Sequence, residues 1–146
     1  MDLRARRLFG RGVLVAAREG ANVVVADLAP DGIEETVGLV NEAGGQARAV
    51  TGDVTSSDDI DAMVKTAVDA FGRLDAAFNN AGIAVGGEIR GYSIRDWEDV
   101  FDVNLRGVVH GIQAVYPLMI EQGFGHIVNT ASMAGLTPSP GGVAYA

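Results

Sequence analysis

The sequence contains no cysteine, which excludes disulfide bonds and thiolate zinc sites. This absence fits a cytoplasmic protein, and we expect that location. No apolar run approaches the roughly 18–20 residues of a membrane span, so no membrane partner is predicted. Histidine is also scarce, with two residues, His110 and His126, that we interpret as surface or helix residues rather than catalytic ones. No grouping of side chains resembles a metal-ligand cluster, and we predict no metal site.

Positive charge is scarce beyond the first 18 residues. That opening stretch carries five arginines against one aspartate, whereas the whole chain has a net charge of −8. An acidic body is a poor surface for phosphate backbones, so we expect no nucleic-acid partner. The basic start is not serine-rich and runs directly into a helix-like stretch, so we do not interpret it as a targeting segment.

Glycine is abundant, with 20 residues in 146, about twice the usual share. Such an excess indicates turns with special dihedral angles or close approach of the backbone to a ligand. The hydrophobic content of 48% is ordinary for a globular protein. The sequence therefore predicts one folded domain over residues 1–146, without repeats or an interdomain linker.

Short apolar runs alternate with longer helical patterns along the chain. Strands are expected around Val23–Val25, closing on Asp27, and within residues 47–54, 74–82 and 125–132. Helices are expected at residues 12–17, 29–45, 56–72 and 93–123, with the start of another at 143–146. Pro117 should kink the long helix or mark a junction in it. The alternation predicts parallel βαβ units in a Rossmann-like, doubly wound α/β sheet.

Small or polar residues follow each expected strand. Asp27, Asp53, the segment Asn79-Asn80-Ala81-Gly82 and Ser132 occupy these places. Taken singly, each of these residues can have a purely structural role, since an aspartate after a strand is usually a turn residue or a helix cap. Ligands of doubly wound sheets bind beyond the carboxyl ends of the strands. The combination, in this order along a β/α chain, therefore indicates a ligand-binding edge.

These motifs together resemble the short-chain dehydrogenase/reductase family. The resemblance rests on Asp53-Val54, on "NNAG" at 79–82, on "DWEDVFDVNLRG" around Asn104, on "GHIVNTAS" with Ser132, and on Tyr145. It runs from about Ala17 to the end of the sequence. The resemblance implies an oxidoreductase that transfers a hydride between a nicotinamide cofactor and a secondary alcohol or ketone.

The resemblance also implies roles for individual residues on the cofactor side. Asp27 would bind the adenosine ribose, and its charge would favour NAD over NADP, whose 2′-phosphate it would repel. Asp53 and Val54 would flank the adenine. The backbone of Asn80, Ala81 and Gly82 would line the cofactor.

The implied catalytic residues are Asn104, Ser132 and Tyr145. Asn104 would hold a water and bend its helix for a proton relay, Ser132 would orient the substrate oxygen, and Tyr145 would be the general acid or base. A free phenol has a pKa near ~10, so it needs a nearby cation and a low-dielectric pocket. The family supplies a lysine four positions after the tyrosine, which is position 149 and beyond this sequence. Family members commonly assemble through their long helices, which implies a homo-oligomer.

Two departures from the family pattern lie at the ends. The family opens with a strand and a glycine-rich phosphate turn, whereas here only "FGRG" precedes "VLVAA", with Gly10 or Gly12 as a relic of the last glycine. Residues 12–17 are then the remnant of the first helix. That first strand would lie in the middle of the sheet, so its loss would split the sheet and leave unpaired strand edges. We expect the chain to be incomplete at both ends, without the first strand and the C-terminal strands.

Two non-catalytic alternatives remain for these 146 residues. One is a truncated relic that is unstable or survives only through a partner. The other is a nucleotide-binding module without redox chemistry. NAD binding with or without turnover would distinguish the alternatives.

Overall fold

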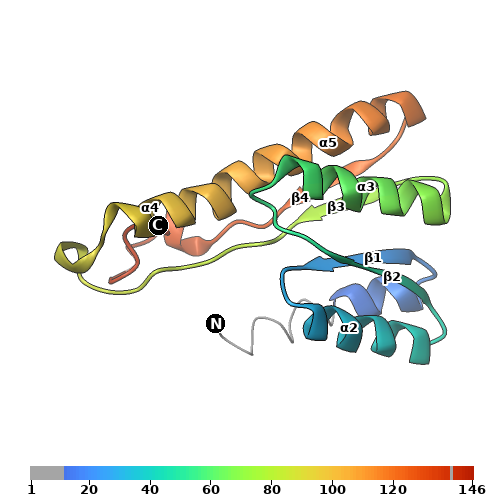
Figure 1. Cartoon of the computed structure of the whole chain (residues 1–146), viewed down its shortest axis with the longest axis horizontal. Coiled ribbons are helices and arrows are strands. Elements are labelled where there is room, and N and C mark those ends of the chain that lie inside the picture. The colour runs from blue at the N-terminus through green and yellow to red at the C-terminus, as the bar shows by residue number, and fades with distance from the viewer. Residues whose placement is uncertain (1–11, 139) are drawn as a thin grey trace. The chain divides into compact units, whose positions relative to one another are not determined.

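The computed structural model describes residues 12–138 and 140–146 (Figure 1). Expectations about Gly10 and the arginines at positions 4, 6, 7 and 11 lie outside the described residues. The described chain divides into two compact units. The first comprises residues up to Asp53 together with Asp61–Leu74, and the second comprises Val54–Ile60 together with Asp75–Ala146.

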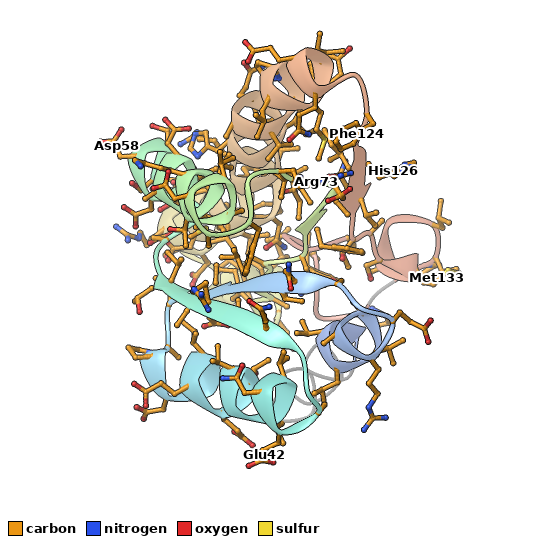
Figure 2. All side chains as sticks on the ribbon, turned by 90° about the vertical axis from the view of Figure 1, so that its right-hand side faces the viewer. Glu42, Asp58, Arg73, Phe124, His126 and Met133 are labelled. Atoms are coloured by element: carbon orange, nitrogen blue, oxygen red, sulfur yellow. The ribbon has the colours of Figure 1, made fainter. Side chains whose placement is uncertain are left out.

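The first unit is built on a two-stranded parallel sheet. Strand β1 (Asn22–Asp27) pairs with β2 (Gln46–Thr51) in a register that runs from Asn22 opposite Gln46 to Asp27 opposite Thr51. Helix α2 (Pro30–Glu42) crosses between them and covers one face of the sheet (Figures 1 and 2). Residues 12–18 are helical, which confirms the expected helix rather than a substitute strand.

Helix α2 begins and ends where its sequence favours it. Pro30 occupies the first turn, where its missing N–H costs nothing, and Asp31 places a negative charge at the positive end of the helix dipole. The helix ends at Glu42 with Ala43 as its C-cap, and Gly44 follows with φ +84°, a conformation that glycine adopts without a Cβ clash. The expected start and stop of this helix are confirmed.

The core of the first unit joins the sheet to both helices on one face. Ala17, Val40 and Ala47 are buried together, and Val13, Leu14, Val23 and Val37 pack around them. A Cβ on Gly45 would lie 3.0 Å from the Ala17 Cβ, so the turn after α2 approaches the first helix closely. Helix α3 (Ser57–Phe71) starts at the Ser56 cap, whose Oγ accepts from the Asp59 N–H at 3.3 Å.

The second unit contains the other sheet and the long helical segment. Strand β3 (Ala76–Asn79) pairs in parallel with β4 (His126–Asn129), with Asn79 opposite Asn129. Between them lie α4 (Ile94–Phe101), a π-helical turn (Asp102–Arg106) and α5 (Gly107–Gln122). Helix α5 runs along the β3–β4 pair (Figure 1). In the described ranges, no helix is long and apolar enough to cross a membrane.

Helix α4 begins with a reciprocal cap between Ser93 and Asp96. The Ser93 Oγ accepts from the Asp96 N–H, while the Asp96 carboxylate accepts from the Ser93 N–H at 2.7 Å. Hydrogen bonds from the Ser93 hydroxyl, and then from its backbone, lower the pKa of Asp96 below its ordinary value. This part of the cap is therefore present at neutral pH and is lost as the pH falls through that lowered pKa.

Two expectations about element boundaries need correction. Pro117 marks no junction, because it lies inside α5, and the long segment changes instead at the π-helical turn. Strand β4 ends at Asn129, so Ser132 follows the strand by a short coil. Residues 143–146 form one turn, in which the Ala146 N–H donates to the Gly142 carbonyl four residues back, as it would at the start of a helix.

The strands of the described residues form two separate two-stranded sheets rather than one. In the family order 3-2-1-4-5-6, β1 and β2 correspond to the strands on one side of the first strand, and β3 and β4 to those on the other. Across residues 12–138 and 140–146, β1 pairs only with β2 and β3 only with β4. The expected split of the sheet is therefore confirmed.

Replacing Val40 by Ala should lower the free energy of unfolding of the first unit by about 2 kcal/mol, because the substitution removes two fully buried methyl groups. The Val40 side chain is 0% exposed, whereas Val15 on the first helix is 58% exposed. Val15→Ala is the matched control and should change the stability by less than about 0.5 kcal/mol. Urea unfolding followed by circular dichroism measures both, and equal losses would contradict the core assignment.

Candidate functional site

The carboxyl edge of the first unit presents Asp27 to solvent. The β1–β2 ladder continues one step past β2, because the Gly52 N–H donates to the Asp27 carbonyl at 3.2 Å. The Asp27 carboxylate is exposed, and its Oδ1 accepts from the Ala29 N–H at 3.0 Å. A carboxylate has about four acceptor positions, so this one turn bond leaves most of its capacity. Asp53, half-buried, is the next residue after Gly52.

The carboxyl edge of the second unit carries two side-chain pairs that join its strands. The Asn79 Nδ2 donates to the Asn129 Oδ1 at 2.8 Å, and the Thr130 Oγ1 donates to the Asn80 Oδ1 at 2.9 Å. The Thr130 N–H also donates to the Asn79 carbonyl at 3.0 Å. The first two residues of the "NNAG" segment are therefore held by β4, while Ala81 and Gly82 are exposed.

Two glycines let α5 approach the second unit's loops without intervening side chains. A Cβ on Gly111 would lie 2.1 Å from the Asn79 Oδ1, and one on Gly107 would lie 2.8 Å from the Val54 Cγ2. The His110 Nδ1 lies 3.0 Å from the Val54 carbonyl, which assigns the ring proton to Nδ1. His110 is thus a half-buried helix residue that holds Val54, as its expected structural role implied.

Asn104 lies in the π-helical turn and binds the segment that follows "NNAG". Its Oδ1 accepts from the Ile83 N–H at 2.8 Å, and its Nδ2 donates to the Ile83 carbonyl at 2.8 Å. The Gly107 N–H bonds to the carbonyl of Asp102, five residues back, instead of to Val103. Such π turns are frequent at functional sites.

Ser132 caps a short 3₁₀ turn, Met133–Gly135, that directly follows it. Its Oγ accepts from the Ala134 N–H at 3.1 Å. The hydroxyl hydrogen is not used in that bond, so Ser132 can still donate to a substrate oxygen. Met133 is 68% exposed and points outward beside this turn (Figure 2).

Tyr145 lies in the turn near the end of the chain, where its N–H donates to the Gly142 carbonyl at 3.0 Å. Its side chain is 37% exposed. Within the described residues, no direct hydrogen bond joins Asn104, Ser132 and Tyr145. The structure therefore connects Asn104 to Ile83, directly after the "NNAG" segment, and Asn80 to Thr130, directly after β4. In the part of the chain that the structure describes, no hydrogen bond joins Ser132 to Tyr145.

Several residues that build this edge escaped the sequence analysis. Asn129 and Thr130 carry no motif of their own, and only the pairing register reveals them. Gly107 and Gly111 did leave a signal, because glycine in a helix interior costs roughly 1 kcal/mol relative to alanine. Two glycines one turn apart on a helix therefore indicate a close approach on that face.

The profile of the family described as short chain dehydrogenase matches residues 10–146. The chain belongs to the short-chain dehydrogenase family. Among its relatives, an uncharacterized oxidoreductase of Listeria innocua is 36% identical over 132 residues, which is 90% of this chain and 53% of the relative.

Solved structures agree with this assignment. NAD⁺-bound xylitol dehydrogenase is 36% identical with a TM-score of 0.85, covering 93% of this chain and 54% of that one. A short-chain dehydrogenase/reductase from Burkholderia phymatum in complex with NAD is 37% identical with a TM-score of 0.88, covering 94% and 50%. The Rossmann-like α/β fold class is confirmed. The chain spans about half the length of the relatives it matches.

Replacing Gly111 by Ala should destabilise the second unit by about 2–3 kcal/mol, because the new Cβ overlaps Asn79 and breaks its bond to Asn129. Gly38→Ala is the matched control, since it also lies inside a helix but has no atom within 4 Å of an added Cβ. The control should raise stability by about 0.5–1 kcal/mol. Thermal unfolding measures the stability of both variants. A Gly111→Ala variant more stable than the parent would refute the close approach of α5 to Asn79.

Proposed function

We propose that this chain carries the cofactor edge and reacting residues of an NAD-dependent oxidoreductase acting on a secondary alcohol or ketone. The observation that carries the proposal is the exposed Asp27 carboxylate at the end of β1. It occurs in a family member whose structural relatives include proteins bound to NAD.

Each candidate cofactor residue is proposed for a role of its own. Asp27 accepts hydrogen bonds from the adenosine ribose hydroxyls, and its charge disfavours the 2′-phosphate of NADP. Asp53 and Val54 flank the adenine, with Val54 held through its carbonyl by His110. Asn80, Ala81 and Gly82 offer backbone to the cofactor, and the Asn80–Thr130 bond fixes the start of that segment. The fit is supported by the exposure of Asp27, Ala81 and Gly82.

The reacting residues are proposed in distinct roles. When bound, the nicotinamide supplies or accepts the hydride. Ser132 donates its hydroxyl hydrogen to the substrate oxygen, since its Oγ already accepts from Ala134. Tyr145 gives or takes the proton on that oxygen as general acid or base. Asn104 holds a water of the proton relay, and its side chain fixes its helix against Ile83.

Binding of NADH and NADPH to the chain tests the cofactor assignment. Trp97 is the single tryptophan, so energy transfer from it to the reduced nicotinamide reports binding. We expect NADH to bind more tightly than NADPH. Asp27→Ala should weaken NADH binding about 10- to 100-fold, the value of hydrogen bonds to a charged group.

Asp58→Ala, at an exposed aspartate in the first turn of α3, is the matched control and should leave NADH binding unchanged. Equal affinity for both cofactors, or an Asp27→Ala variant that binds like the parent, would sink the ribose assignment. NADH binding without turnover of any secondary alcohol would favour a nucleotide-binding module instead.

A second copy of this chain is the proposed partner of the α4–α5 segment. Exposed apolar side chains follow one face of this segment at helical spacing: Phe101, Leu105, Val109, Tyr116 and Ile120. A contiguous exposed apolar stripe indicates an interaction surface. Two copies related by a two-fold axis would present the same stripe to each other and cover it.

Leu105→Arg should shift the chain from dimer or larger species to monomer, because it places a charge in the middle of this stripe. Leu28→Arg is the matched control, since both leucines are 64% exposed and Leu28 lies outside the stripe. Light scattering after size exclusion gives the mass of each. A parent chain that is monomeric at every concentration would refute the proposal.

A further inference from the structure

Tyr92 joins two segments that lie far apart in the sequence. Its hydroxyl lies 2.6 Å from the Val85 carbonyl and 3.1 Å from the Gly141 carbonyl. A phenol has one hydrogen, so the shorter contact is the main bond and the longer one shares it. Val85 belongs to the loop after "NNAG", whereas Gly141 lies four residues before Tyr145.

The Gly141 carbonyl is the point where the two segments meet. It accepts from the Gly87 N–H at 2.8 Å as well as from the Tyr92 hydroxyl, which uses both of its lone pairs. Gly87 and Gly141 have φ values of +152° and +76°, so both positions favour glycine. The next residue, Gly142, in turn accepts from the N–H groups of Tyr145 and Ala146. The contacts of Tyr92 thus reach the turn that carries Tyr145.

The Tyr92 ring packs against an aromatic side chain of α4. It meets the Trp97 ring edge-on with centroids 5.9 Å apart, and Trp97 meets Phe101 in the same manner at 6.0 Å. Its other edge lies 3.5 Å from the position of a Cβ on Gly87. Ser93, the adjacent residue, is the cap of α4. The hydroxyl is therefore presented from the start of a well-capped helix.

The joined segments form the walls of a groove. It has a volume of about 550 Å³ and is lined by Gly87, Glu88, Ile89, Arg90, Gly141 and Val143. Ile89 and Val143 are apolar, while Glu88 and Arg90 form an ion pair. Because Gly141 is bound by both Gly87 and Tyr92, the hydroxyl of Tyr92 helps hold the two walls together.

We propose that Tyr92 is a positioning residue that holds the Tyr145-bearing turn against the loop at residues 85–90. Its contacts to Val85 and Gly141 fix the position of this turn against the loop. They thereby also fix the groove between the two segments. The part that concerns catalysis by Tyr145 rests on the proposed oxidoreductase function. The contact between the turn and the loop does not depend on that function. The contact and its effect on catalysis can therefore be tested separately.

Hydrogen exchange of the full chain tests the contact between the turn and the loop. Tyr92→Phe removes the hydroxyl and keeps the ring. We expect amide exchange in peptides covering residues 85–92 and 140–146 to become about two- to tenfold faster, as the loss of one hydrogen bond predicts. Exchange in α4 should stay unchanged, and the emission maximum of Trp97 should not move, because the ring contact is retained.

Thr66→Val is the matched control, because it also removes a hydroxyl that donates to a main-chain carbonyl, that of Ala62 at 2.8 Å, and Thr66 lies within α3. It should leave exchange in both peptides unchanged. Unaltered exchange in Tyr92→Phe would overturn the proposal. So would equal acceleration throughout α4, since that would make Tyr92 a general stability residue rather than one that positions the Tyr145 turn.

Turnover of a secondary alcohol with NAD forms a second, independent arm. Tyr92→Phe should lower kcat several-fold and leave the KM for NAD unchanged, because the cofactor residues are elsewhere. An unchanged kcat with faster exchange would overturn the link to Tyr145 alone. If the parent chain does not turn over substrate while the exchange result holds, catalysis by these 146 residues is refuted and the contact made by Tyr92 stands.

Discussion

The close approach of α5 to the end of β3 sets the geometry of the second unit. The Asn79 amide occupies the space that a side chain at Gly111 would fill, with 2.1 Å between its Oδ1 and the position of that Cβ. From there Asn79 reaches Asn129 across the sheet. Gly107, one turn earlier, admits Val54 in the same way. The helix can lie this close only because glycine has no Cβ. Gly107 and Gly111, which are otherwise unfavourable in a helix, therefore determine the positions of the loops.

The segment after β3 is consequently held to the same helical element at both of its ends. Asn79 packs on Gly111, and Ile83 is bound through its N–H and carbonyl by Asn104. Asn104 precedes Gly111 by about two helical turns, so both contacts come from the same face of the helical element. The exposed residues between them, Ala81 and Gly82, are thereby presented on a supported backbone. A loop fixed in this manner can meet a ligand without a large loss of entropy on binding.

The alternation of strands and helices could be predicted because buried parallel strands and amphipathic helices leave different periods in the sequence. The predicted boundaries of helices and strands were less accurate where the side-chain pattern and the backbone geometry disagree. Pro117 suggested the junction of the long helix, yet the helix passes through it and changes pitch at Asp102–Arg106. The π turn contains Asn104, for which the family resemblance implied a bend in the helix, and the Asn104 side chain bonds to Ile83. Ser132 was placed at a strand end and in fact caps a 3₁₀ turn beyond it.

The sequence by itself determined the βαβ order, the parallel pairing and the family. Each of these follows from local periodicity or from a motif that is contiguous along the chain. Only the tertiary structure decided which polar groups meet, as in the Asn79–Asn129 and Asn80–Thr130 pairs and the contact of Tyr92 with Gly141. Those pairs join residues about fifty positions apart. Their partners are set by strand register and helix packing, which no local pattern of side chains records.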